Sequence, residues 1–287
     1  MKKYNFDEVI NRKGTSSYKW DNATYSDGKD MLPMPVADMD FRVADEIIDA
    51  LNVVNSHGVL GYSLPDDELK SLIQQKLKED YQWETNLDWQ VWIPGIVPGI
   101  TAACAAFATS ERGILTAVPV YHPFHLVAGW VNKPLKTFQM IEKEGRWTFD
   151  FVEFEDKLKE GADVFLFCNP HNPGGTVFNQ KEIDKIIDLC QTYNCKIISD
   201  EIHADIRLQA QSKHICIGKH LPFNNNSISF FSTTKAYNTA GLGIAVAIIP
   251  DANVRQKFLQ HTFGYLPMLS RHAIEMKKAC LQNGKNW

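Results

Sequence analysis

Residues 163–175 read DVFLFCNPHNPGG, a short apolar run followed at once by asparagine, proline, histidine and two glycines. The same arrangement returns in KIISDEIH at 196–203 and in SISFFSTTKAYNTAGL at 227–242. Short runs of β-branched and aromatic residues that are apolar throughout are typical of strands covered on both faces of a sheet. The three stretches therefore predict buried strands that each end in a polar turn.

The segment between the first two runs indicates how these strands are connected. In QKEIDKIIDLCQTYN at 180–194, the apolar side chains of Ile183, Ile186, Ile187 and Cys190 recur at helical spacing. A helix of this length between two strands is what a parallel crossover requires. We therefore predict an α/β fold, with a mostly parallel sheet sandwiched by helices. Further strands are expected at 114–118 (ILTAV) and 244–249 (IAVAII).

The N-terminal part of the chain has a different pattern. Residues 1–44 carry no sustained period and are interrupted by Pro33 and Pro35, so we expect an extended arm. Helical spacing begins after residue 44 and returns after the capping sequence Ser63-Leu64-Pro65-Asp66. We predict an arm over residues 1–44 and a large domain over residues 45–260.

Composition excludes several classes of function. The 287 residues are 44% hydrophobic and 22% charged, which is typical of a globular protein and not of a disordered or fibrous one. A net charge of -4 with interspersed signs gives no basic surface for nucleic acid or anionic lipid. No apolar run could span a membrane, no signal peptide is recognisable, and the six cysteines form no CxxC pair. We expect a cytoplasmic protein with reduced thiols.

The polar turns after the strands hold the candidate site, because ligands bind at the carboxyl ends of parallel strands. Those turns carry Asn172, Asp200 and Lys235, and Tyr121 follows the run at 114–118. Each residue alone has an ordinary reading as a turn residue, a helix cap, a solvated lysine or a core ring. Together they offer an amine, a carboxylate and a stacking ring, which is what a pyridine aldehyde phosphate requires.

Three motifs in this order resemble a known family. NPHNPGG, SDEIH and STTKAYNTAGL are similar to the class I/II aminotransferase fold (fold type I) of pyridoxal 5'-phosphate enzymes. Within it they look most like the MalY/PatB subgroup, the cystathionine β-lyase-like C–S lyases. The segments LPMPVADMDF at 32–41 and GVLGY at 58–62 resemble that subgroup as well. The resemblance implies pyridoxal 5'-phosphate (PLP) as cofactor and an amino acid as substrate.

The resemblance also implies a role for each residue of the turns. Lys235 would form the internal aldimine and later remove the α-proton of the substrate. Asp200 would pair with the pyridinium nitrogen, and Asn172 would donate to the phenolic oxygen. His203 would contact the same oxygen or form a wall of the pocket, and Tyr121 would stack on the ring.

The cofactor phosphate needs its own donors. The turn at 97–101 is expected to precede an alanine-rich helix, so Ile100 and Thr101 are candidates at the helix N-terminus. Ser232, three residues before Lys235, is expected to add a hydroxyl. The family pattern takes a further contact from a tyrosine of the neighbouring subunit, here Tyr62, which implies a homodimer.

Other motifs carry no support for metal or nucleotide binding. His122 and His125 lie three residues apart, but Pro123 disfavours a regular metal-binding helix there. Neither a GxxxxGK[ST] loop nor a GxGxxG turn after a strand occurs. We therefore expect no metal and no nucleotide cofactor.

For the reaction, three alternatives stay open. The resemblance favours a PLP-dependent carbon–sulfur β-lyase that converts cystathionine or a related cysteine conjugate to a thiol, pyruvate and ammonia. Gly243 stands where many aminotransferases carry an arginine, and this departure, with His203, favours elimination over transamination. A PLP-dependent aminotransferase is the first alternative. The second is a truncated, catalytically weak PLP-binding or regulatory protein.

The second alternative follows from chain length. The family places a small domain after the large one, and that domain supplies the arginine that clamps the substrate carboxylate. Fewer than fifty residues follow the lysine motif, whereas such a domain needs on the order of a hundred. We therefore expect residues 261–287 to begin a connection to a missing C-terminal domain, and neither Arg255 nor Arg271 can be assigned as the clamp.

Overall fold

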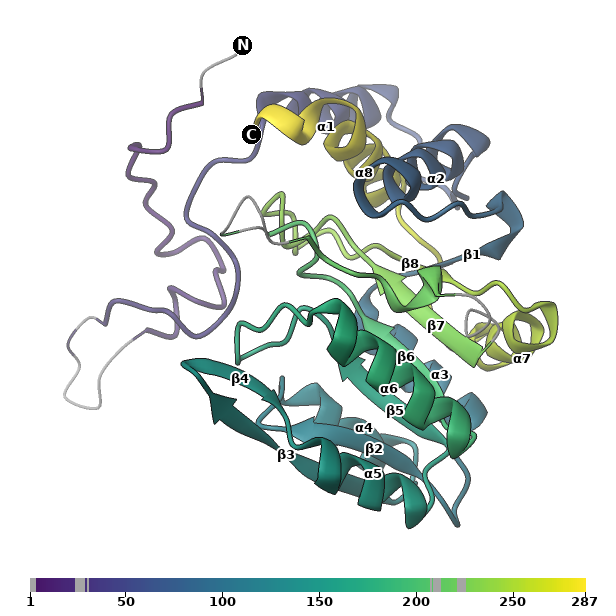
Figure 1. The fold of residues 1–287 in the computed structure, drawn as a ribbon. Coiled ribbons are helices and arrows are strands. Elements are labelled where there is room, and N and C mark those ends of the chain that lie inside the picture. Colours follow the sequence, from purple (N-terminus) through teal and green to yellow (C-terminus); the bar gives the residue numbers. More distant parts are fainter. Residues whose placement is uncertain (1–3, 24–28, 30, 207, 209–212, 221–225) are drawn as a thin grey trace.

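The computed structural model describes residues 4–23, 29, 31–206, 208, 213–220 and 226–287. Its centre is one mixed sheet with the strand order β1-β8-β7-β6-β5-β2-β3-β4 (Figure 1). Neighbouring strands from β7 through β6, β5 and β2 to β3 are parallel, whereas the pairs β7–β8, β8–β1 and β3–β4 are antiparallel. The predicted α/β class with a mostly parallel sheet is confirmed.

The parallel strands coincide closely with the apolar runs of the sequence. They are β2 (Ile114–Val118), β5 (Val164–Cys168), β6 (Lys196–Asp200) and β7 (Ser227–Phe231). β8 (Ala245–Ile248) was expected from its sequence run as well. The sequence did not indicate β1 (Gln90–Ile93), β3 (Leu135–Lys143) or β4 (Arg146–Phe149). These strands lie toward the sheet edges and are less uniformly apolar.

Two layers of helices cover the sheet (Figure 1). On one face lie α3 (Ile96–Phe107), α4 (Pro123–Trp130) and α7 (Ala252–Thr262). On the other lie α5 (Phe151–Lys159) and α6 (Gln180–Thr192), where Ile183, Ile186 and Ile187 are buried as their spacing predicts. The α6 helix connects the parallel strands β5 and β6, as the predicted crossover requires.

Three helices from distant parts of the sequence pack together at one end of the molecule. They are α1 (Asp45–His57), α2 (Asp67–Tyr81) and α8 (Arg271–Asn283), and α8 lies beside α1 in Figure 1. Asp66 caps α2 by accepting a hydrogen bond from the Leu69 amide, as the capping sequence predicts. Asp66 also pairs with Lys278 of α8, which ties the two helices together.

The N-terminal arm extends along one side of the molecule, apart from both helix layers (Figure 1). Its described residues before Asp45 form neither helix nor strand, which agrees with the predicted extended arm. All six cysteines are buried with free thiols. Within the described part of the chain, no helix has the length and apolar character needed to cross a membrane.

Candidate active site

The predicted site residues follow the carboxyl ends of four strands. Asn172, Asp200 and Lys235 come at or after the ends of β5, β6 and β7, and Tyr121 follows β2. The four strands are adjacent and parallel, so their ends meet at one edge of the sheet. The sheet thus brings together residues that are far apart in the sequence.

The turn after β5 is fixed by its own backbone and by one thiol. The Asn172 amide donates to Cys168 Sγ at 3.3 Å, and the Tyr121 amide donates to the Asn172 carbonyl at 2.9 Å. The Gly174 amide donates to His171 Nδ1 at 3.3 Å, so the ring proton of neutral His171 lies on Nε2. Burial lowers the pKa of His171 to about 4, which keeps this ring neutral near pH 7. The turn therefore positions Asn172 through its backbone, and the side-chain amide of Asn172 takes no part in these hydrogen bonds.

Asp200 is a buried carboxylate at the end of β6. One of its oxygens, Oδ1, accepts from the Ile202 amide at 3.1 Å. Burial raises the pKa of Asp200 to about 7; the Ile202 amide and the charge on Lys235 oppose this rise, and the charge on Glu201 adds to it. A carboxylate in this setting is ionised at low cost only when a cation binds beside it.

Lys235 lies on the loop after β7, where its ammonium interacts with both Asp200 and His203. Its Nζ donates a hydrogen bond to the carbonyl oxygen of Ala37 at 3.3 Å. Ala37 belongs to the last part of the N-terminal arm, before the domain begins. The amine is therefore held between the sheet and a segment 198 residues earlier in the chain.

A cavity of about 600 Å³ borders the turns after β5 and β6, and Asp200, Lys235 and Tyr121 are not among the residues that line it. Its lining includes Asn172, His203 and Ala37, so one space joins the turn after β5, the turn after β6 and the N-terminal segment. Burial, together with the nearby Lys235 charge, lowers the pKa of His203. Burial also raises the pKa of Tyr121, with a smaller effect from Asp200, which places the ring near this carboxylate.

The structure corrects the prediction of a phosphate-binding turn at residues 97–101. Helix α3 begins at Ile96, so Ile100 and Thr101 lie within the helix and not before it. Ile100 is fully buried, and the Thr101 hydroxyl donates to the Val97 carbonyl at 2.8 Å. The expectation failed because Pro98 was read as a residue preceding the helix, whereas proline is tolerated in a first turn, where amides have no helical partner. The free amides are those of Ile96 and Val97.

The remaining two phosphate candidates occupy different settings. The Ser232 hydroxyl is buried and donates to the Ile244 carbonyl at 2.7 Å, so its single proton is already engaged. Tyr62 lies between α1 and α2 with 94% of its surface exposed. Within this single chain, Tyr62 therefore contributes nothing to the enclosed site.

The structure explains why glycine occupies position 243. A Cβ atom added at Gly243 would lie 2.3 Å from the carbonyl oxygen of Pro94, well inside van der Waals contact. The backbone at Gly243, two residues before β8 begins, approaches the segment before α3 too closely for any side chain at this point. An arginine at position 243 could not be accommodated without moving that segment.

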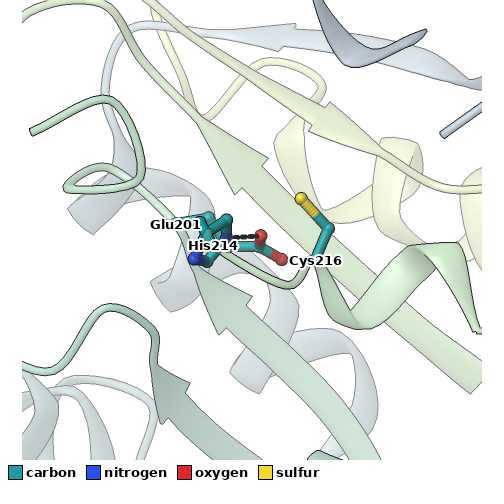
Figure 2. A group of neighbouring side chains, drawn as sticks. All are labelled: Glu201, His214 and Cys216. Carbon is teal, nitrogen blue, oxygen red and sulfur yellow. Dashed lines mark hydrogen bonds and ion pairs between the residues drawn. The ribbon is translucent and has the colours of Figure 1, made fainter. Parts of the chain in front are cut away.

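A second group of buried polar side chains lies next to the site. His214 Nε2 and Glu201 Oε2 are 2.6 Å apart, and the Cys216 thiol lies beside them (Figure 2). Glu201 directly follows Asp200, but its carboxylate engages His214. Glu201 Oε2 and His214 Nε2 are hydrogen-bonded to each other, whereas two metal ligands would lie farther apart with the ion between them. We therefore interpret this group as a buried hydrogen-bonded pair that stabilises the turn after β6.

Comparison with known proteins agrees with this arrangement. The family model described as aminotransferase class I and II matches residues 29–285. This chain belongs to that family. Cystathionine beta-lyase PatB of Bacillus subtilis is 34% identical, over 99% of this chain and 74% of the relative. The family assignment follows from the match over nearly the whole chain.

Two solved structures of the family extend the comparison. One, described as OvoB, has a TM-score of 0.94 and 33% identity, over 99% of this chain and 74% of that chain. The other is cystalysin from Treponema denticola, described as containing pyridoxal 5'-phosphate. It has a TM-score of 0.92 and 28% identity, over 100% of this chain and 74% of that chain. The expected PLP-transferase fold is confirmed.

Some residues of the site gave no recognisable signal in the sequence. In the sequence, Cys168 looks like any other buried strand residue. Its role as the acceptor of the Asn172 amide is visible only in the folded turn. Ala37 offers its backbone carbonyl, which any residue could provide. Asn238 contacts the segment that carries Ala37, and its left-handed backbone, with φ of 53°, can be read only from the structure.

Proposed function

We propose that this protein is a PLP-dependent carbon–sulfur β-lyase that acts on cystathionine or a related cysteine S-conjugate. The observation that carries the proposal is the buried Asp200 carboxylate at the meeting point of four strand ends, near enough to Lys235 for the two charges to interact. Family membership and the lyase names of similar proteins support the same reading.

The residues present fit the cofactor. The high pKa of Asp200 reflects a buried carboxylate that needs a cationic partner, and a protonated pyridine nitrogen is such a partner. Asn172 would hold the phenolic oxygen, Tyr121 would stack on the ring, and His203 would close the cavity. The Ile96 and Val97 amides at the start of α3 would receive the phosphate, since a helix N-terminus favours anions.

In the proposed reaction, bound PLP supplies an electron sink that stabilises negative charge at the substrate α-carbon. Lys235 Nζ removes the α-proton, and Asp200 keeps its negative charge beside the ring nitrogen. The bond between the β-carbon and sulfur then breaks, and the thiolate leaves and takes up a proton. Water hydrolyses the released 2-aminoacrylate, so the products are a thiol, pyruvate and ammonia.

The decisive experiment uses the PLP-reconstituted protein with L-cystathionine. We expect pyruvate and a free thiol to form in equal amounts, and a Schiff-base absorption band before substrate is added. Lys235→Ala should abolish that band and lower kcat/KM by about 10²–10⁴-fold or more, because the lysine is the general base. Lys257→Ala on α7 is the matched control and should leave both unchanged. A wild-type protein that binds PLP but forms no pyruvate would contradict the lyase assignment.

An aminotransferase is the alternative function, because the matching family model is described as aminotransferase class I and II. It would require turnover that depends on an added keto acid and leaves the carbon–sulfur bond intact. Gly243 and His203 favour elimination. Running the same assay with and without a keto acid separates the two reactions, and PLP binding without either product would identify a weak or regulatory protein.

We further propose a cytoplasmic homodimer built on residues 45–260 as the cofactor domain, with residues 261–287 leading toward a small domain. Free buried thiols fit a reducing compartment. Exposed apolar side chains at 59–64 (Val59, Leu60, Tyr62 and Leu64) fit a subunit interface. Sedimentation of the purified protein tests the dimer, and a monomer at all concentrations would contradict it.

A further inference from the structure

The segment from Val36 to Phe41, here called the wall segment, lies over Lys235 and has no regular secondary structure. It contributes Ala37 to the cavity that Asn172 and His203 also line. An irregular segment of this kind keeps its position only if other groups satisfy its backbone. Two sets of side chains do so, one from the loop after β7 and one from the N-terminal arm.

Asn238 supplies the first set of contacts, three residues after Lys235. Its Oδ1 accepts from the Met39 amide at 2.8 Å, and its Nδ2 donates to the Met39 carbonyl at 3.0 Å and the Phe41 carbonyl at 2.8 Å. The side-chain amide thus pairs with the wall segment as a neighbouring strand would. Asn238 therefore links the loop that carries Lys235 to the wall segment, whose Ala37 carbonyl accepts a hydrogen bond from Lys235.

Asp40 supplies the second set of contacts. Its carboxylate accepts from Lys19 Nζ at 2.7 Å, from Trp20 Nε1 at 2.8 Å and from Arg12 Nη1 at 2.7 Å. Arg12 also reaches Asp38 at 2.6 Å. Burial opposes ionisation of Asp40, but these three donors outweigh it and lower its pKa to about 2. Residues 12–20 of the arm therefore bind the wall segment through its carboxylates.

We propose that Asn238 and Asp40 are positioning residues. They hold the wall segment against Lys235, so that the Ala37 carbonyl receives the ε-amino group of Lys235 and Ala37 keeps its place in the lining of the cavity. This inference rests on the proposed function only in treating Lys235 as the reacting amine. The contacts of Asn238 and Asp40 do not depend on that reaction.

The main test variant is Asn238→Gly. Glycine keeps the left-handed backbone of position 238 and removes all three side-chain hydrogen bonds. Asn132→Gly is the matched control, because Asn132 has nearly the same backbone conformation, with φ of 52°, at the end of α4. Asp40→Asn keeps the shape of the carboxylate and removes its charge.

The first two measurements use the cofactor-free protein. We expect Asn238→Gly to increase hydrogen exchange at the Met39 amide by about tenfold, because the bond that protects it is lost. Acetylation of Lys235 by acetic anhydride, followed by mass spectrometry of peptides, should become roughly fivefold faster as the wall segment opens. Asn132→Gly should change neither rate. Rates within twofold of wild type in Asn238→Gly would overturn the proposal.

The third measurement uses the PLP-loaded enzyme. We expect Asn238→Gly to raise KM for cystathionine by about tenfold with kcat changed less than about threefold, because the cavity wall is displaced while the lysine stays. Asp40→Asn should act in the same direction. Because both residues hold the same segment, their effects in the double variant should not add.

These outcomes separate this proposal from the proposed function. If no lyase activity is found in any variant, the exchange and acetylation rates still decide whether Asn238 holds the wall segment. If activity is present but KM and kcat fall together in Asn238→Gly, with the exchange rate unchanged, Asn238 does not act as a positioning residue.

Discussion

Two buried regions that meet at strand β5 illustrate opposite uses of the protein interior. On one face, six phenylalanine rings pack with one another, with centroid separations such as 4.7 Å between Phe138 and Phe154. This phenylalanine cluster consists of Phe138, Phe149, Phe154, Phe165, Phe167 and Phe178. At the carboxyl ends of the strands, the interior instead collects a carboxylate, hydroxyls and amides.

The strand-end region contains several buried polar atoms with no hydrogen-bond partner among the described residues. They include Asn169 Oδ1 and Ser199 Oγ, and Ser229 Oγ in the middle of β7 is a further one. Each such group costs free energy that the phenylalanine cluster does not incur. The phenylalanine cluster therefore stabilises the fold, whereas the strand-end region carries groups suited to a ligand. Three predictions test this contrast.

The largest effect is expected in the phenylalanine cluster. Phe154 is fully buried on α5, and Phe154→Ala should lower the free energy of unfolding by about 3–5 kcal/mol, because it leaves a cavity among well-packed rings. Urea denaturation measures the change. Val152→Ala on the same helix is the control, since Val152 is 71% exposed. The activity of the folded fraction should be unchanged, and a selective loss of activity would break the contrast between the regions.

The next effect has the opposite sign and depends on pH. The pKa of Asp200 is about 7 in the folded protein and near 3.8 when unfolded, so the folded state binds the extra proton between these values. Stability of the cofactor-free protein should therefore fall as pH rises from about 4 to 7. Asp200→Asn removes this loss and should stabilise the cofactor-free protein at pH 8 by up to roughly 4 kcal/mol.

Denaturation curves of the two proteins from pH 4 to pH 8 check this prediction. In the PLP-loaded protein the sign should reverse, because the carboxylate then has a cationic partner that asparagine cannot replace. Parallel stability profiles for wild type and Asp200→Asn across this pH range would show that burial does not raise the pKa of Asp200.

The smallest effect concerns the hydroxyl of Ser229 in the middle of β7. Ser229 is fully buried, and its Oγ has no partner in the described part of the chain. Ser229→Ala should raise the free energy of unfolding by about 1 kcal/mol, because it removes an unsatisfied polar group. Ser199→Ala, at the paired position on β6, should behave in the same way. A loss of stability in both variants would show that these hydroxyls are engaged in the folded protein.

The centre of the sheet and the positions of the main candidate site residues were predictable from the amino-acid sequence. The runs that became β2, β5, β6 and β7 are apolar throughout, and burial of such runs is favourable whichever partner they meet. Asn172, Asp200 and Lys235 follow these runs directly, so placing the strands also placed the residues. This part was predictable because the signals are local and the carboxyl ends of parallel strands converge.

The remaining features depend on how distant parts of the chain pack. Whether Pro98 lies before or within α3 depends on how the helix packs, since Gly99 must sit against Ile93 and Phe230. The close approach of the backbone at position 243 to the Pro94 carbonyl excludes a side chain there. The Ala37 carbonyl meets Lys235 through contacts that span nearly two hundred residues. Backbone groups have the same chemistry in every residue, so a sequence cannot mark which of them will meet the reacting amine, and only the folded chain selects one.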